Sequence, residues 1–189
     1  MADLPLTENG LRQARCAAER IVEDSRKGAV LKPTIIFSSP LRRAMQTAQA
    51  VANAVGLPVL REDGLKDIDY GLWQGLSLPE AYHKYRKDYV QWLHSPQLVK
   101  FPQGESLPVV QERVSRLPHF EDDNHNDDVV LFVTHKVVSK VLVLTLLGAD
   151  LSHFWQIKQD VAAISIFEKR NVFLMASAIN DTCHLNAKV

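Results

Sequence analysis

The segment from Ser38 to Ala48, which reads SSPLRRAMQTA, says most about how this chain is built. It follows the short apolar run at 34–37, so the pattern predicts a strand that turns directly into a helix, with Pro40 at the first helical position. The first peptide N–H groups of a helix have no partner inside it, and the helix dipole is positive there. Arg43, one turn into the helix, adds a two-pronged donor suited to phosphate. The sequence therefore predicts an anion site at this helix start.

Helical and extended patterns alternate along the rest of the chain, which is typical of an α/β fold. Helices are expected over residues 7–27, 40–55, 79–94, 107–116 and 137–147. Strands are expected over residues 34–37, 57–61, 129–133, 161–167 and 172–178, the last two as a hairpin. The run at 129–133 is apolar throughout, which indicates a central strand buried on both faces. We expect one domain over residues 1–189, with a helical insertion at about 76–117.

Composition and charge exclude several classes of function. The 22 lysines and arginines balance the 22 aspartates and glutamates, so no long-range field draws the chain to nucleic acid or to an anionic membrane. Neither Cys16 nor Cys183 belongs to a CxxC pair or a Cys/His ligand cluster. The longest apolar stretch, at 141–148, is far too short to span a bilayer. We therefore expect a cytoplasmic protein with no metal, no cofactor, and no nucleic-acid or membrane partner.

Two further residues are candidates for the site that contains Arg43. His135 stands where the run at 129–133 ends and a helix begins, which is the edge of a parallel sheet where ligands bind. The alternative is that His135 only hydrogen-bonds to the backbone near a helix start. Asp67 lies in a loop at 65–75 that contains glycines and aromatic residues, where a carboxyl group could act as a general acid. The alternative for Asp67 is a turn aspartate that caps its own backbone, and position alone does not decide between these roles.

Six segments resemble, in the same order, the motifs of the histidine phosphatase (phosphoglycerate mutase-like) superfamily, although each alone is a weak signal. They are residues 5–10, 38–48, 67–75, 104–106, 133–135 and 180–185. The short insertion between Gly75 and Gly104 and the Tyr-Gly-x-Trp-x-Gly loop are similar to the small phosphatase branch, which includes alpha-ribazole phosphatase-like proteins. The resemblance implies a three-layer α/β/α sandwich with a mostly parallel sheet. It also implies hydrolysis of a small phosphorylated metabolite through a phosphohistidine.

The resemblance also implies a role for each residue that matches a family motif. Arg43 corresponds to the phosphate-binding arginine, and His135 to the second histidine, which binds the phosphoryl oxygens and stabilises the transition state. Asp67 stands where the family usually has a glutamate that protonates the leaving oxygen, so its side chain must reach about one methylene further. Residues 136–137 replace a usual Gly-Gly pair. His184 is expected to be a hydrogen-bonded structural anchor.

The family's nucleophile is a histidine in an Arg-His-Gly motif at the end of its first strand, and this sequence contains no such tripeptide. The chain begins just before Pro5, so we expect it to be N-terminally truncated, without the strand and loop of roughly two dozen residues that members carry upstream. That strand would lie beside the one that leads to His135. Its absence is expected to leave two open sheet edges and an apolar slot, with marginal stability or self-association.

Three hypotheses about function follow. The favoured one is a phosphomonoester hydrolase whose start is recorded downstream of the true one, so that the 189-residue chain itself is inactive. The first alternative is a non-catalytic protein that binds a phosphorylated ligand or a protein partner. The second alternative is a phosphoglycerate mutase, which the short insertion disfavours. The sequence leaves the substrate and the oligomeric state open.

Overall fold

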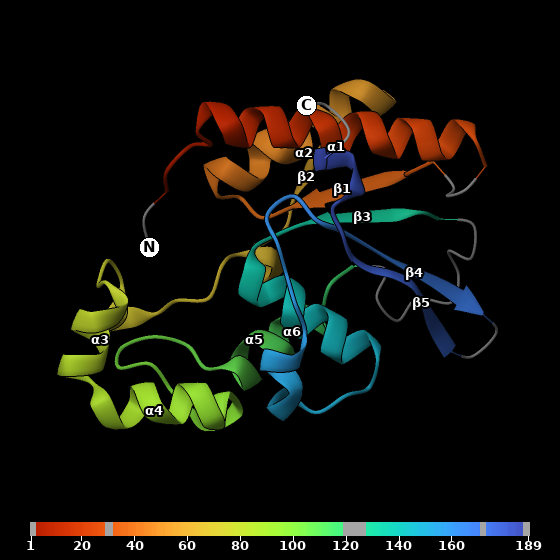
Figure 1. Ribbon diagram of the computed structural model, residues 1–189. Coiled ribbons are helices and arrows are strands. Elements are labelled where there is room, and N and C mark those ends of the chain that lie inside the picture. Colours follow the sequence, from red (N-terminus) through yellow and green to blue (C-terminus); the bar gives the residue numbers. More distant parts are fainter. Residues whose placement is uncertain (1–2, 29–31, 119–127, 171–172, 187–189) are drawn as a thin grey trace.

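The computed structural model describes residues 3–28, 32–118, 128–170 and 173–186. A three-stranded parallel sheet lies at its centre, in the order β2-β1-β3. The strands are β1 (Ile35–Ser38), β2 (Leu60–Arg61) and β3 (Val130–Val133). The predicted hairpin is confirmed: β4 (Ile164–Arg170) and β5 (Phe173–Asp181) pair antiparallel and lie beside β3 (Figure 1).

Helices cover both faces of the sheet (Figure 1). They are α1 (Glu8–Arg26), α2 (Arg42–Val55), α3 (Leu78–Lys84), α4 (Arg86–His94), α5 (Leu107–Val114), α6 (Lys136–Leu146) and α7 (Cys183–Asn186). Successive side chains of a strand point to opposite faces, so Ile36 packs with α1 and α2, and Phe37 packs with α5 and α6. The predicted three-layer α/β/α sandwich with a mostly parallel sheet is confirmed.

Local signals set the ends of the first two helices. The Thr7 side chain accepts a hydrogen bond from the Gly10 N–H (3.2 Å) at the start of α1, as its N-cap position predicts. Gly56 ends α2 in the left-handed conformation, with φ at 78°. The prediction for Pro40 is wrong, because Leu41 is still extended and the helix starts at Arg42. Pro40 therefore lies in the turn between β1 and α2.

The predicted helix over 79–94 is interrupted. The chain leaves helical dihedrals at Tyr85, where φ is −129°, and this residue separates α3 from α4. The rings of Tyr85 and Tyr89 both stack on Trp73, with centroids 5.7 and 5.9 Å away. This aromatic packing involves a loop that precedes both helices, and tertiary contacts of this kind outweigh helix propensity. The helical segment at 107–116 is confirmed as α5, which ends at Val114.

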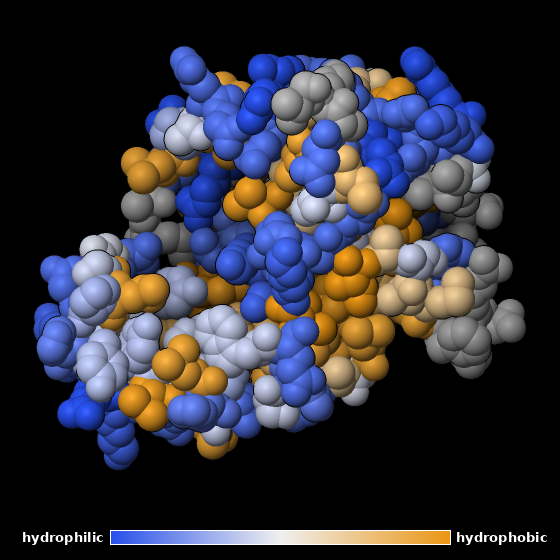
Figure 2. Space-filling model, viewed as in Figure 1, coloured by the Kyte–Doolittle hydropathy of each residue, from blue (hydrophilic) through white to orange (hydrophobic). Residues whose placement is uncertain are grey.

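The prediction that the run at 129–133 forms a central strand is wrong for the part of the chain that the structure describes. β3 is an edge of the three-stranded sheet, paired with β1, and its four residues are only half-buried. A cavity of about 1480 Å³ lies between β3 and β4, and we call it the β3 slot. In the same view, apolar side chains are exposed across the middle of the molecule, between the two helix layers (Figure 2). The apolar character of β3 suits a strand that is covered on both edges.

Three other expectations concern a membrane-spanning helix, the histidines before β3, and His184. No helix among the described residues combines the length and the apolar character needed to cross a bilayer. His119 and His125, in or beside the acidic stretch before β3, lie outside the described residues. His184 is buried in α7 and its Nε2 lies 3.0 Å from the Ala162 carbonyl oxygen, so the prediction of a structural anchor is confirmed.

Candidate active site

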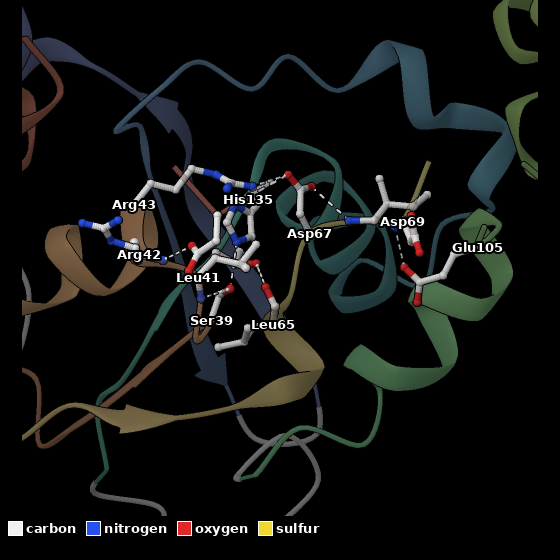
Figure 3. A network of polar contacts seen from close by, with 12 residues as sticks. Ser39, Leu41, Arg42, Arg43, Leu65, Asp67, Asp69, Glu105 and His135 are labelled. Atoms are coloured by element: carbon white, nitrogen blue, oxygen red, sulfur yellow. Dashed lines mark hydrogen bonds and ion pairs between the residues drawn. The ribbon is translucent and has the colours of Figure 1, made fainter. Parts of the chain in front are cut away.

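Three residues that are far apart in the sequence meet at the carboxyl ends of β1 and β3 (Figure 3). Arg43 comes from the first turn of α2, Asp67 from the loop after β2, and His135 from the N-cap of α6. Arg43 Nη2 lies 2.8 Å from Asp67 Oδ2, and His135 Nδ1 lies 3.7 Å from the same oxygen. The structure therefore brings together all three predicted site residues, and they line one end of the β3 slot.

Ser39 holds the imidazole of His135 in place. The Ser39 N–H donates to the Val133 carbonyl oxygen (2.9 Å), which extends the pairing of β1 and β3 to the edge of the site. The Ser39 Oγ lies 2.8 Å from His135 Nε2 and also accepts from the Leu41 N–H (3.3 Å). The Asp67 carboxylate, 3.7 Å from Nδ1, favours the tautomer with a proton on Nδ1, and in that tautomer Nε2 accepts the hydrogen of the Ser39 hydroxyl.

The contact between His135 and Ser39 resolves the alternative raised by the sequence. The side chain of His135 makes no capping hydrogen bond to its helix, and its partner is another side chain. Only 8% of the residue is exposed. Burial is the main cause that lowers the pKa of His135 to about 4; the negative charge of Asp67 opposes this shift, and the positive charges of Arg43 and Arg113 add to it. The ring is therefore neutral at pH 7 and presents one N–H donor.

Asp67 caps its own backbone, as one of its two alternatives predicts, and it also forms an ion pair, while its role as a general acid stays a prediction. Its Oδ1 accepts from the neighbouring Ile68 N–H (3.0 Å), as a turn aspartate does, while Oδ2 binds Arg43. The half-buried Tyr70 packs close by against Phe101, with ring centroids 4.9 Å apart. Burial raises the pKa of Tyr70 to about 12, with a further contribution from the negative charge of Asp67. Asp67 thus lies between a cationic group and an apolar wall.

The start of α2 is not an open anion site. The Arg42 N–H donates to Oδ1 of Asp3 (2.6 Å), and the Leu41 N–H donates to Ser39, so a carboxylate and a hydroxyl of the chain take these donors. The prediction that this helix start binds the anion needs correction, because the groups that face the cavity are the side chains of Arg43 and His135. The side chain of Arg42 is exposed to solvent.

Comparisons with known proteins agree with this arrangement of residues. Residues 1–182 match the family model described as "Histidine phosphatase superfamily (branch 1)". The chain belongs to the histidine phosphatase superfamily. Phosphoserine phosphatase 1 of Hydrogenobacter thermophilus is 36% identical over 188 residues, which are 98% of this chain and 84% of that protein.

Two solved structures share the histidine phosphatase fold. Bacillus stearothermophilus YhfR superimposes with a TM-score of 0.84 at 26% identity, covering 97% of this chain and 88% of the other. The alpha-ribazole phosphatase from Shigella flexneri superimposes with a TM-score of 0.80 at 23% identity, covering 95% of this chain and 86% of the other. The resemblance to alpha-ribazole phosphatase-like proteins is therefore confirmed at the level of the fold.

The structure also places near the candidate site residues that the sequence interpretation missed. Ser39 lies in the segment quoted first, and its position directly after β1 could have marked it. Thr134, next to His135, donates through Oγ1 to the Leu65 carbonyl oxygen (2.7 Å) and ties the end of β3 to the loop of Asp67. Arg113 in α5 also reaches this loop, and no local pattern distinguishes it.

Other polar residues also line the cavity in the part of the chain that the structure describes. His135 is the one histidine among the described residues that line the β3 slot. Lys136 lines it too and is exposed, so its ammonium group stands where the family usually has a glycine. Within the described ranges, no group of three His, Cys, Asp or Glu side chains has the arrangement of a metal site.

Proposed function

We propose that this chain carries the phosphate-binding and proton-donating groups of a phosphomonoester hydrolase that works through a phosphohistidine. The observation that carries the proposal is the meeting of Arg43, Asp67 and His135 at one end of a large cavity. A guanidinium and a neutral imidazole N–H are suitable donors for phosphoryl oxygens. A bound phosphate competes with Asp67 for the guanidinium of Arg43 and leaves the carboxyl group beside the leaving oxygen.

The nucleophile would come from a strand in the β3 slot. The sequence contains no Arg-His-Gly tripeptide, and β3 presents an unpaired edge to the slot in the described structure. A strand parallel to β3 would bring its own carboxyl end to the level of His135, because parallel strands end at the same edge of a sheet. A histidine at that end would face Arg43 and His135 across the phosphate. The 189-residue chain would then bind phosphate without hydrolysing the ester.

The reaction would proceed in two balanced steps. In the first, the histidine nitrogen forms a bond to phosphorus as the bond to the ester oxygen breaks, and the Asp67 carboxyl group gives its proton to that oxygen. In the second, water attacks phosphorus, the bond to the histidine nitrogen breaks, and the Asp67 carboxylate accepts a proton from the water. Arg43 and His135 stabilise the charge on the phosphoryl oxygens in both steps.

Phosphoserine is the first substrate to test, because the relative named phosphoserine phosphatase 1 matches 98% of this chain. The acid role of Asp67 matters most for such an ester, since its alkoxide is a poor leaving group. Release of inorganic phosphate would separate a hydrolase from a mutase, which moves the phosphoryl group to another hydroxyl. Retention of the ester together with phosphate binding would favour the non-catalytic alternative.

The experiment compares the 189-residue chain with the same chain extended at its N-terminus by a strand that ends in an Arg-His-Gly loop. Release of inorganic phosphate from p-nitrophenyl phosphate and phosphoserine is measured for both. We expect turnover only in the extended chain. Alanine at the supplied histidine should abolish it, and His135→Ala should lower kcat by roughly 100-fold or more.

Two results would count against the proposal. Turnover by the unextended chain that is lost in His135→Ala would show that the nucleophile is already present. An extended chain that folds and binds phosphate but releases none from any ester would support the non-catalytic alternative.

A further inference from the structure

Arg113 joins three segments around the loop that carries Asp67. Its Nη1 donates to the carbonyl oxygen of Gly64, and its Nη2 donates to the carbonyl oxygen of Asp67 itself (3.3 Å). Its Nε donates to Oε1 of Glu105 (3.2 Å), in the turn before α5. The side chain of Arg113 is only 19% exposed. One guanidinium thus holds the backbone on both sides of the site loop.

Glu105 completes the contact from the other side. Its Oε2 accepts from the Asp69 N–H (2.9 Å), and its own N–H donates to the Asp69 carbonyl oxygen (2.8 Å). Figure 3 shows the Glu105 side chain directed at Asp69, with Asp67 one step further along the same loop. Asp67 is therefore bracketed by two fixed neighbours, Gly64 and Asp69.

The two backbones are in close contact at this point. A Cβ on Gly104 would lie 2.4 Å from the Asp69 carbonyl oxygen, and a Cβ on Gly71 would lie 2.1 Å from the Pro102 carbonyl oxygen. Gly71 also has a positive φ of 52°. The Leu72 N–H donates to Pro102 O (2.9 Å) across the same junction. The turn before α5 is thus a rigid support for the loop, and it leaves no room for side chains in between.

We propose that Arg113 and Glu105, which we call the Arg113–Glu105 clamp, are positioning residues that set the reach of the Asp67 carboxyl group toward the leaving oxygen. This inference rests on the proposed function. An aspartate has one side-chain torsion fewer than a glutamate, so the place of its carboxyl group depends more directly on the backbone. Since Arg113 binds the carbonyl group of Asp67, it fixes that backbone. A planar guanidinium can bind three acceptors in this way, and an ammonium group cannot match its fork.

The same helix offers a matched control. Arg116 pairs with Glu112 through Nη2 and Oε1 (2.7 Å), and both side chains are more than 60% exposed. The pair lies on α5 and just after it, and neither residue contacts the loop of Asp67 in any described hydrogen bond. Arg116→Gln therefore removes a charge and an ion pair of the same type without touching the clamp.

The first test uses the 189-residue chain and needs no catalysis. Hydrogen exchange of the Ile68 and Asp69 amides is measured by NMR in wild type, Arg113→Gln, Arg113→Lys and Arg116→Gln. We expect exchange at both amides to be at least tenfold faster in the two Arg113 variants and unchanged in Arg116→Gln, while the β1 amides keep their protection. Unchanged protection in both Arg113 variants would overturn the proposal. If Arg113→Gln fails to fold, Arg113→Lys still decides the result.

The second test uses the extended chain and separates positioning from general damage. Protonation of the leaving oxygen matters for phosphoserine and little for p-nitrophenyl phosphate, whose phenolate leaves readily. We expect Arg113→Gln and Glu105→Gln to lower kcat for phosphoserine about tenfold, with p-nitrophenyl phosphate and both KM values within about threefold. Equal losses on both substrates would overturn the clamp.

A double-mutant cycle identifies the residue through which the clamp acts. In an Asp67→Asn background, Arg113→Gln should cause little further loss on phosphoserine, because the group that it positions is already gone. A full additional loss would show that Arg113 acts elsewhere. An extended wild type without any turnover would contradict the proposed function, while the exchange measurement would still decide whether the clamp holds the loop.

Discussion

The two edges of β3 differ in whether their backbone groups pair with a neighbouring strand. One edge pairs with β1 over four consecutive positions, from Ile35 opposite Val130 to Ser38 opposite Val133. That pairing leads directly to the contact between Ser39 and His135. The other edge faces the β3 slot, and β4 on the far side pairs with β5. The comparison indicates that existing hydrogen bonds assemble the side of the site that carries His135, while in the described structure the other edge of β3 has no strand paired with it.

Adding a strand beside the free edge of β3 should have the largest effect on stability. A strand of several buried Val, Leu or Ile residues contributes about 1.5–3 kcal/mol for each such side chain. We expect the extended chain to unfold at a Tm on the order of 10 °C higher than the 189-residue chain, measured by calorimetry.

The same edge predicts the association behaviour of the unextended chain. An unpaired strand edge and an apolar slot favour contact between copies, so we expect sedimentation to show concentration-dependent association that the extension suppresses. A monomeric 189-residue chain with cooperative unfolding and an unchanged Tm on extension would show that the slot needs no strand.

Acid should lower the free energy of unfolding through the protonation of His135. In the unfolded chain this histidine takes up a proton near its ordinary pKa of 6.5, whereas the folded site, with a pKa of about 4, does not until the pH is much lower. The folded state binds fewer protons in this window, so its stability falls as the pH drops from about 6.5 to about 4, by up to roughly 3 kcal/mol. Urea unfolding in phosphate-free buffer at several pH values measures the loss. His135→Gln should lack this part of the pH dependence, and parallel profiles would contradict the prediction.

Arg43 and Arg42 provide a test of which arginine serves the site. Arg43 lines the cavity and binds Asp67, while the side chain of Arg42 is exposed. A hydrogen bond to a charged group contributes about 1.5–3 kcal/mol, so Arg43→Ala should weaken binding of orthophosphate roughly 10- to 100-fold. Calorimetric titration of the 189-residue chain measures this affinity, and Arg42→Ala should stay within about twofold. Equal losses would show that only overall charge matters.

Ser39 and Ser38 allow the finest comparison. Both are fully buried, but Ser39 contacts His135, whereas the Ser38 Oγ donates to the Ser39 carbonyl oxygen (3.0 Å) and makes no described hydrogen bond to Arg43, Asp67 or His135. Loss of one neutral hydrogen bond costs about 1 kcal/mol, so Ser39→Ala should weaken phosphate binding by about fivefold. The ¹⁵N shifts of His135 should also report a mixture of tautomers in Ser39→Ala and the wild-type tautomer in Ser38→Ala. The same shifts in both variants would contradict the role of Ser39.

Much of the fold followed from signals that act over a few residues. The N-cap at Thr7 and the glycine at 56 are local devices, and they gave the start of α1 and the end of α2 correctly. The break at Tyr85 was missed because it depends on Trp73, which belongs to a different segment. The apolar run at 129–133 by itself predicted a central strand, and an open edge was expected only from the family resemblance, because hydrophobicity shows that a strand suits burial and not which neighbours are present.

The sequence by itself determined that Arg43, Asp67 and His135 are the candidates for one site, since strand ends and loop composition are local properties and the family motifs keep their order. Only the tertiary structure decided what holds these residues. The hydrogen bond between Arg113 and Gly64 spans 49 positions, and the contact between His135 and Ser39 spans 96. Such partners are selected by packing in three dimensions, which leaves no periodic trace along the chain.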